Sequence, residues 1–221
     1  MADFGNKCYR KISSTSFPEV FLSTKKEASD FFKGETTLRL VFESPRSSED
    51  LDFSLLITPA KSIEDLLEET LLQLSYQQIA LDMTEAKPTS GGYLFYAKTY
   101  LFDMEIILKL NFVIKKSIDN QTETIKSVFI PPYSVVVLKA RELIKEKVSA
   151  FLERHKVRDF FDLYYIMRAN LEKDVILSKR EEIIKVINSS KADLSELKVF
   201  LPRTFLPLLK DLKDNLLREL R

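Results

Sequence analysis

The chain has 221 residues, 45% of them hydrophobic, and its 34 Lys and Arg residues nearly cancel 33 Asp and Glu. This length allows one sizeable core or two small lobes, and the balanced charge provides no global field that favours nucleic acid or a membrane. One cysteine and one histidine exclude disulfide scaffolds and Cys/His zinc sites. With no apolar stretch that could cross a bilayer and no secretory pattern at the N-terminus, we expect a cytoplasmic protein without a membrane partner.

The first part of the chain alternates helical and strand-like patterns. Helices are predicted at 36–42 and 62–78, and strands at 52–57, 91–102, 105–114 and 124–130. Ser62 is the expected cap of the second helix, which carries a stripe of leucines and isoleucine at helical spacing. The two central strands follow each other closely and read as an antiparallel hairpin.

Pro131-Pro132 marks a change of character, because a double proline fits neither a helix interior nor a central strand. After it, nearly every segment has helical periodicity. Helices are predicted at about 137–154, 158–170, 173–188 and 203–219. We therefore expect an α/β lobe over residues 1–132, followed by a helical lobe over residues 133–221.

The run at residues 48–53 places two acids two positions apart at the start of a predicted strand. Asp50 and Asp52 would project to one face of that strand, while Leu51 and Phe53 face the core. Two carboxylates on one face repel each other unless a cation or protons lie between them, and Mg²⁺ is a suitable cation. The run alone is equally compatible with two solvated acids in a loop.

Two further runs have both a chemical and a structural interpretation. Gly34 precedes a predicted helix, where a glycine would let backbone N–H groups approach a phosphate. Asp159 and Asp162 are three positions apart and are therefore neighbours on a helix surface. These residues also fit a simple glycine turn and a capped helix, and Lys147 by its spacing alone reads as a solvated lysine.

Read together, residues 34–53 and 147–164 resemble the AbiEii/AbiGii toxin family. Its members are nucleotidyltransferase-like proteins of the DNA polymerase β-type superfamily, known as toxins of type IV toxin–antitoxin systems. The family pattern is Gly-Gly-Thr-x-Leu-Arg, then Ser-x-Asp-Leu-Asp-Phe, then a lysine-bearing helix followed by Arg-Asp-x-x-Asp-Leu-Tyr. The matching residues are Gly34, Thr36, Leu38, Arg39, Ser48, Asp50, Leu51, Asp52, Phe53, Lys147, Ala150, Arg154, Arg158, Asp159, Asp162, Leu163 and Tyr164.

The resemblance implies an α+β fold, in which a nucleotidyltransferase-like mixed sheet with flanking helices precedes a C-terminal helical lobe. It also implies roles for individual residues. Asp50 and Asp52 would bind Mg²⁺ and form the catalytic group together with Lys147 and Asp162. An NTP would be held by Gly34, Thr36, Arg39 and Ser48, while Asp159 and Arg158 would have supporting roles.

The function that follows is Mg²⁺-dependent transfer of a nucleotidyl group from an NTP to an acceptor. The acceptor would be RNA, with tRNA included, or a protein hydroxyl, and an antitoxin protein would be a partner. Glu35 and Asn111 depart from the pattern, because they stand where a second glycine and a third metal-site acid are expected. They motivate one alternative, a non-catalytic binding or regulatory module. A small-molecule nucleotidyltransferase of the antibiotic-modifying kind is a further alternative, which the sequence does not distinguish.

Two other groups of side chains have open interpretations. Tyr93, Tyr96 and Tyr100 on the predicted hairpin could stack a base or simply pack within the sheet. The basic residues around His155 could hold a phosphate or form a solvated junction between helices.

Overall fold

The computed structural model describes residues 30–48, 50–56, 58–101, 104–126 and 131–221. The chain divides into two compact units, which we describe separately. The sheet unit contains residues up to Glu43 and Ser47–Leu138, and the helical unit contains Ser44–Arg46 and Lys139–Arg221. Within the described ranges, no helix combines the length and the apolar character that a membrane span requires.

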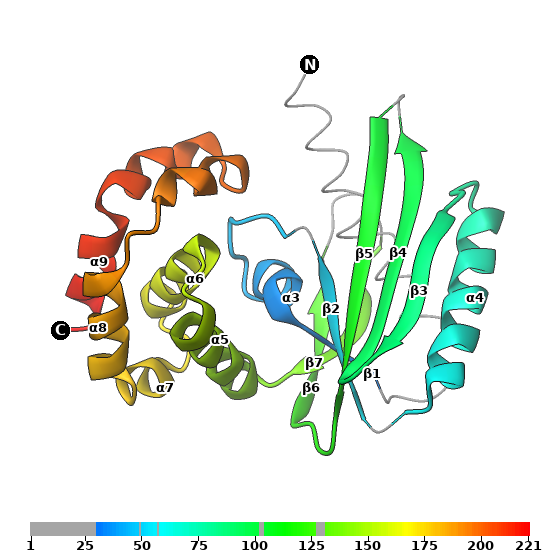
Figure 1. The fold of residues 1–221 in the computed structure, drawn as a ribbon, viewed down its shortest axis with the longest axis horizontal. Helices are drawn as coiled ribbons and strands as arrows, with labels where there is room; N and C mark the ends of the chain where they lie inside the picture. The colour runs from blue at the N-terminus through cyan, green and yellow to red at the C-terminus, as the bar shows by residue number, and fades with distance from the viewer. Residues whose placement is uncertain (1–29, 49, 57, 102–103, 127–130) are drawn as a thin grey trace. The chain divides into compact units, whose positions relative to one another are not determined.

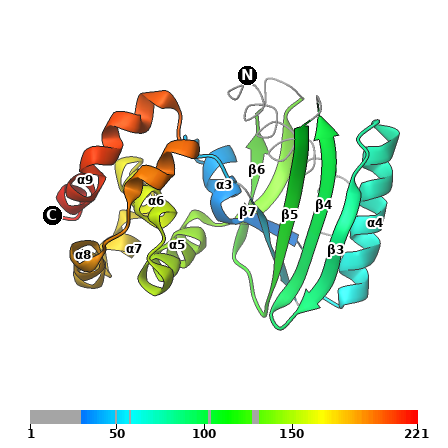
Figure 2. The same ribbon diagram turned by 45° about the horizontal axis from the view of Figure 1, so that its top comes forward.

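The sheet unit is built on one seven-stranded mixed sheet in the order β3-β4-β5-β2-β1-β7-β6 (Figures 1 and 2). Its strands are β1 (Asp30–Lys33), β2 (Leu51–Leu56), β3 (Asp82–Thr89), β4 (Gly92–Leu101), β5 (Met104–Lys115), β6 (Asn120–Ile125) and β7 (Tyr133–Leu138). β2 pairs in antiparallel with β1 and in parallel with β5, and β1 also pairs in parallel with β7. The predicted α+β class with a mixed sheet is confirmed.

The core of this unit lies on one face of the sheet, along which α4 (Ala60–Tyr76) packs. Apolar residues alternate along β2, β4 and β5 so that one side of each strand is buried against this helix. The rings of Phe53 and Phe112 stack across the β2–β5 pair with centroids 5.2 Å apart. Leu51 and Phe53 are buried as predicted, and Asp52 between them is therefore on the opposite face.

Three strands in the sheet unit, β1, β3 and β7, were not predicted. β3 is almost entirely exposed and polar, and it even contains Pro88, so it has no apolar alternation for sequence reasoning to detect. Of β7, only the last two residues fell within a predicted element, the helix at 137–154, because Leu138 fits the periodicity of the helix that follows. The prediction of Ser62 as a helix cap was wrong, since α4 begins two residues earlier behind Pro59.

The other predictions for this unit differ only in their ends. α3 (Gly34–Leu40) replaces the helix predicted at 36–42. β6 begins four residues before the predicted strand at 124–130, whose last four residues lie outside the described ranges, as do residues 57 and 102 of two other predicted strands. Because β7 pairs with β1 and β6, the compact sheet unit continues to Leu138 beyond the double proline.

The helical unit packs its helices around aromatic and aliphatic side chains, and Phe151 meets Phe160 edge to face with centroids 4.9 Å apart. Its elements are α5 (Ala140–Arg154), α6 (Val157–Arg168), α7 (Lys173–Leu177), α8 (Arg180–Ser189), the 3₁₀ segments η2 (Leu194–Val199) and η3 (Arg203–Asp211), and α9 (Leu212–Glu219). The helix predicted at 173–188 is divided into α7 and α8, and that at 203–219 into η3, which contains Pro207, and α9. η2 was not predicted.

Candidate active site

Gly34 stands directly after β1 and begins α3, beside the carboxylate of Asp52. Its φ of +77° lies in the left-handed region, and a Cβ on this residue would come within 2.4 Å of Asp52 Oδ2. The β1–β2 register accounts for this closeness, because Lys33 pairs with Asp52. A glycine is therefore needed here for its backbone conformation and for the space that the Asp52 side chain fills.

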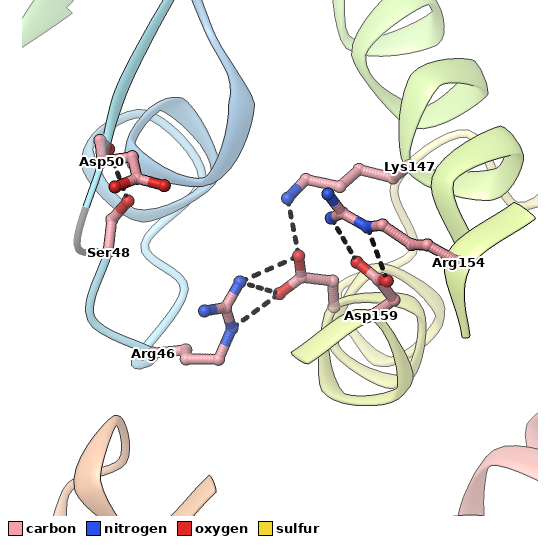
Figure 3. A network of polar contacts seen from close by, with 7 residues as sticks. Arg46, Ser48, Asp50, Lys147, Arg154 and Asp159 are labelled. Carbon is pink, nitrogen blue, oxygen red and sulfur yellow. Dashed lines mark hydrogen bonds and ion pairs between the residues drawn. The ribbon is translucent and has the colours of Figure 1, made fainter. Parts of the chain in front are cut away.

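The main chain at Asp50 is held by two hydroxyl groups. Thr36 Oγ1 donates a hydrogen bond of 3.0 Å to the carbonyl oxygen of Asp50. Ser48 Oγ donates one of 2.8 Å to the same atom (Figure 3). Each hydroxyl has one hydrogen to donate, and here both hydrogens are directed at the protein backbone. The structure thus gives Thr36 and Ser48 a positioning role, while direct contact with a nucleotide stays a prediction.

β5 supplies the neighbours of both aspartates. The parallel register pairs Asp52 with Asn111, and Asn111 Nδ2 donates a hydrogen bond of 3.2 Å to Asp52 Oδ1. Asp50 stands one residue before β2, and Lys109 Nζ lies 3.5 Å from its Oδ1. Asn111, which we singled out as the residue in place of a third acid, therefore does lie beside Asp52.

Lys109 is a member of this site that sequence reasoning missed. The β4–β5 register pairs it with Tyr96, and its Nζ lies 5.6 Å from the centroid of that ring. Partial burial opposes the positive charge, but the attraction of Asp50 and Tyr96 prevails and raises the pKa of Lys109. The site thus contains a cation within reach of its acids.

The three tyrosines of the hairpin do not share one face. Tyr93 is buried on the core face, where its hydroxyl donates to Glu64 Oε1 at 3.2 Å, so strand packing explains it. Tyr96 and Tyr100 lie on the other face of β4, together with Lys109 of β5. Tyr100 is exposed and donates to Glu105 at 3.3 Å.

The acidic pair is suited to a divalent cation. Asp50, Asp52 and the amide oxygen of Asn111 are hard oxygen ligands of the kind that Mg²⁺ prefers. Both carboxylates already face positively polarised groups, Lys109 for one and the Asn111 amide for the other. In the part of the chain that the structure describes, no cluster of three or more acidic, His or Cys side chains forms a fuller metal site.

A second charged cluster lies in the helical unit, around Asp162 of α6. Arg46 reaches this carboxylate with Nε at 2.9 Å from Oδ1 and Nη2 at 3.0 Å from Oδ2, and Lys147 Nζ lies 2.6 Å from Oδ2 (Figure 3). Asp162 and Arg46 are each only 1% exposed, and the Lys147 side chain is 8% exposed. Burial alone would raise the pKa of Asp162, but the two cations hold it below its usual range.

This arrangement brings together two residues that we predicted as catalytic, Lys147 and Asp162, and adds Arg46. The hydrogen-bonding capacity of Asp162 is directed at its two cationic partners, and all three side chains are buried. The geometry therefore supports an anchoring role within the helical unit. Contact of either residue with phosphate or metal stays a prediction.

The supporting residues also have defined partners. Asp159 is 1% exposed and accepts two hydrogen bonds from Arg154, at 2.7 and 2.9 Å, which fixes the turn from α5 into α6. Arg158 lies over the ring of Phe200, with 5.6 Å from Cζ to the centroid. His155 is exposed and ends α5 in the left-handed conformation, so the junction interpretation accounts for this basic segment.

The structure gives less information on two other residues singled out in the sequence, Arg39 and Glu35. Arg39 lies in the last turn of α3, whereas Gly34 begins that helix, so the structure places them at opposite ends of it. The side chain of Glu35 lies outside the described part of the structure.

Of the two residues that were missed, Arg46 and Lys109, only Lys109 had a signal in the sequence. Arg46 stands in the loop that leads to the acidic pair, but a loop arginine normally reads as solvated, and its burial depends on a partner 116 positions away. Lys109 alternates with buried residues along β5, which marks it as a residue of the opposite face. Only the β2–β5 register could show that this lysine meets Asp50.

Solved structures share this fold at low sequence identity. JHP933 from Helicobacter pylori matches with a TM-score of 0.64 and 17% identity, over 95% of this chain and 89% of that one. MenT4, a nucleotidyltransferase toxin from Mycobacterium tuberculosis, matches with a TM-score of 0.63 and 14% identity, over 97% of this chain and 82% of that one. A search among curated proteins found no match.

A mixed sheet with Asp52 against a glycine turn and a second aspartate two residues earlier is the arrangement expected of a nucleotidyltransferase. The family model described as "Nucleotidyl transferase AbiEii toxin, Type IV TA system" matches residues 22–220. The chain belongs to this family, as the motif resemblance predicted.

Proposed function

We propose that this protein transfers a nucleotidyl group from an NTP to an RNA acceptor, with tRNA as the first candidate, and that it requires Mg²⁺. The observation that carries the proposal is the placement of Asp52 against Gly34, with Asp50 two residues before it and polar neighbours from β5 for both acids. As a toxin of its family, it would act in the cytoplasm and be restrained by an antitoxin protein.

In the proposed reaction, a hydroxyl oxygen of the acceptor forms a bond to the α-phosphorus. The bond from that phosphorus to the bridging oxygen breaks, pyrophosphate leaves, and the hydroxyl proton passes to solvent. When bound, Mg²⁺ supplies positive charge that offsets the charge developing on the phosphate oxygens. Asp50 and Asp52 would hold the cation, while Thr36 and Ser48 fix the backbone from which Asp50 projects.

The test is transfer of label from each α-labelled NTP to total RNA, with and without Mg²⁺. Asp52→Asn should abolish transfer, because it removes one of two metal-binding charges with little change of shape. Asp82→Asn, on exposed β3, is the matched control and should transfer like the wild type. Equal transfer by the wild type and Asp52→Asn would overturn the proposal.

The same assay separates the alternative acceptors. Label on the protein fraction in place of RNA would assign a protein hydroxyl as the acceptor. Transfer to an aminoglycoside-type small molecule, with no label on RNA or protein, would assign the antibiotic-modifying alternative. Asn111 gives the non-catalytic module its one structural argument, since it leaves two acids in place of three. Calorimetry showing no binding of Mg²⁺–NTP would favour that module.

A further inference from the structure

We infer that Lys109 is a built-in counter-ion of the acidic pair, which holds Asp50 in the absence of metal and binds the triphosphate once a Mg²⁺–NTP is present. The inference rests on the proposed function and assigns it a further substrate-binding residue. No motif of the family resemblance includes this lysine, so the structure alone carries the assignment.

The sheet register places Lys109 where it can reach Asp50. Leu51 pairs with Leu110 in the parallel β2–β5 ladder. The residues directly before them, Asp50 and Lys109, therefore also lie close together. Lys109 Nζ is 3.5 Å from both Oδ1 and Oδ2 of Asp50. The Lys109 ammonium is therefore equidistant from the two oxygens of the Asp50 carboxylate. A metal ion bound by this carboxylate would compete with the ammonium for the same negative charge.

The ion pair between Lys109 and Asp50 is long enough for Lys109 to exchange Asp50 for another anion. A charge-assisted hydrogen bond to a carboxylate is normally about 2.7–2.9 Å long, so 3.5 Å is at the outer limit of such a bond. Lys109 is 35% exposed and Asp50 is 31% exposed, which leaves both accessible to a ligand. The Tyr96 ring lies 5.6 Å from Nζ, on the same sheet face.

The charges of the site explain why such a lysine is useful. Two carboxylates repel a triphosphate, and with Asn111 in place of a third acid the pair and Lys109 together carry a formal charge of about −1. Lys109 lowers the repulsion that an incoming nucleotide meets. It also competes with free Mg²⁺ for Asp50, so that metal binds best when it arrives with phosphate oxygens as additional ligands.

Removing the positive charge of Lys109 should therefore strengthen the binding of Mg²⁺ alone and weaken the binding of the nucleotide. In Lys109→Met, Mg²⁺ alone should bind about tenfold more tightly, because its competitor is gone, and a non-hydrolysable NTP analogue at saturating Mg²⁺ should bind about tenfold more weakly. A lysine with a purely structural role would weaken both constants together or leave both unchanged.

The experiment is titration calorimetry on the full chain, first with Mg²⁺ alone and then with the α,β-methylene analogue of each NTP at saturating Mg²⁺. Lys109→Arg should restore nucleotide binding to near the wild-type value, because it keeps the charge. Lys98→Met is the matched control: Lys98 lies on the same sheet face but pairs with Glu105 at 3.0 Å, and its loss should move neither constant. Thermal melting of each variant verifies that the chain is folded.

The outcomes separate this inference from the proposed function. If the wild type binds the Mg²⁺–nucleotide analogues and Lys109→Met shifts both constants in the same direction or not at all, the assignment of Lys109 is overturned and the proposed function stands. If the folded wild type binds no analogue with Mg²⁺, both are overturned.

Discussion

Asp50 in the sheet unit and Asp162 in the helical unit are both aspartates that face a lysine. They differ in exposure, in the distance to that lysine and in the number of cationic partners. Asp50 is partly exposed and meets Lys109 at 3.5 Å, whereas Asp162 is buried and is held by Lys147 at 2.6 Å and by two nitrogens of Arg46. Exposed ion pairs contribute little stability and exchange partners readily, while breaking a buried pair leaves an uncompensated charge. The first site is therefore suited to binding a ligand, and the second to maintaining structure.

The largest expected effect is the loss of the buried carboxylate. Asp162→Ala leaves Arg46 and Lys147 buried without their anion, so we expect the free energy of unfolding to fall by about 3–5 kcal/mol. Urea denaturation followed by circular dichroism measures it. Asp174→Ala, which removes an exposed partner of Arg141 in the same unit, should change stability little. A small effect at Asp162 would mean that this cluster is as exchangeable as the acidic pair.

A second test concerns the space at the acidic pair. In Gly34→Ala the added Cβ collides with the Asp52 carboxylate, and the positive φ becomes strained. Because misplacing a catalytic group by about 1 Å can cost about 100-fold, we expect nucleotidyl transfer to fall by roughly that factor. Gly91→Ala is the control, since a Cβ there meets no atom within 4 Å. Transfer by Gly34→Ala at the wild-type rate would show that Asp52 can move without loss.

The pH dependence of stability should report on the buried ion pairs of Asp162. Because the pKa of Asp162 is lowered below its ordinary value of 3.8, its contribution is complete above that value and is lost as the pH falls through the folded-state pKa. Below about pH 4, the wild type should lose up to about 1.4 kcal/mol per pH unit from this group. Asp162→Asn should lack that part of the slope. Parallel slopes for the two proteins in acid would contradict the ion-pair assignment.

The smallest expected effect is at the hydroxyl groups behind Asp50. Ser48→Ala removes one of two hydrogen bonds to the Asp50 carbonyl, which should cost about 0.5–1.5 kcal/mol of stability and lower kcat more than it raises KM. Ser75→Ala removes a comparable hydroxyl-to-carbonyl bond on the exposed side of α4 and should leave transfer unchanged. A rise in KM alone would instead support the predicted contact of Ser48 with the nucleotide.

The sequence was sufficient for the fold class, the family and the two faces of β2. Leu51 and Phe53 alternate with the acids, and that alternation alone separates the core face from the face of the site. The α-helices from α5 onward lie within segments predicted from their apolar spacing, although two of those segments are divided, one of them at the exposed residues around Lys179.

What the sequence did not predict depends on partners distant along the chain. Lys109 reads as an ordinary solvated residue until the β2–β5 register brings it to Asp50, 59 positions away. Arg46 has no local feature that distinguishes it from other loop arginines, and its burial follows from Asp162. β3 was missed because exposed polar strands lack apolar alternation, and it is defined only by its ladder with β4.

The parallel pairing of β2 with β5 also has a kinetic consequence. The β1–β2 pair that brings Gly34 to Asp52 joins segments about 20 positions apart, whereas the contacts of Asp50 and Asp52 with β5 span 59 positions. Contacts between distant segments form late, because closing a long loop costs entropy before any contact is gained. We therefore expect β1 and β2 to pair before β2 pairs with β5, so that the two aspartates come together before they meet Lys109 and Asn111. Pulse-labelling hydrogen exchange during refolding would show this order as protection of β1–β2 before β2–β5.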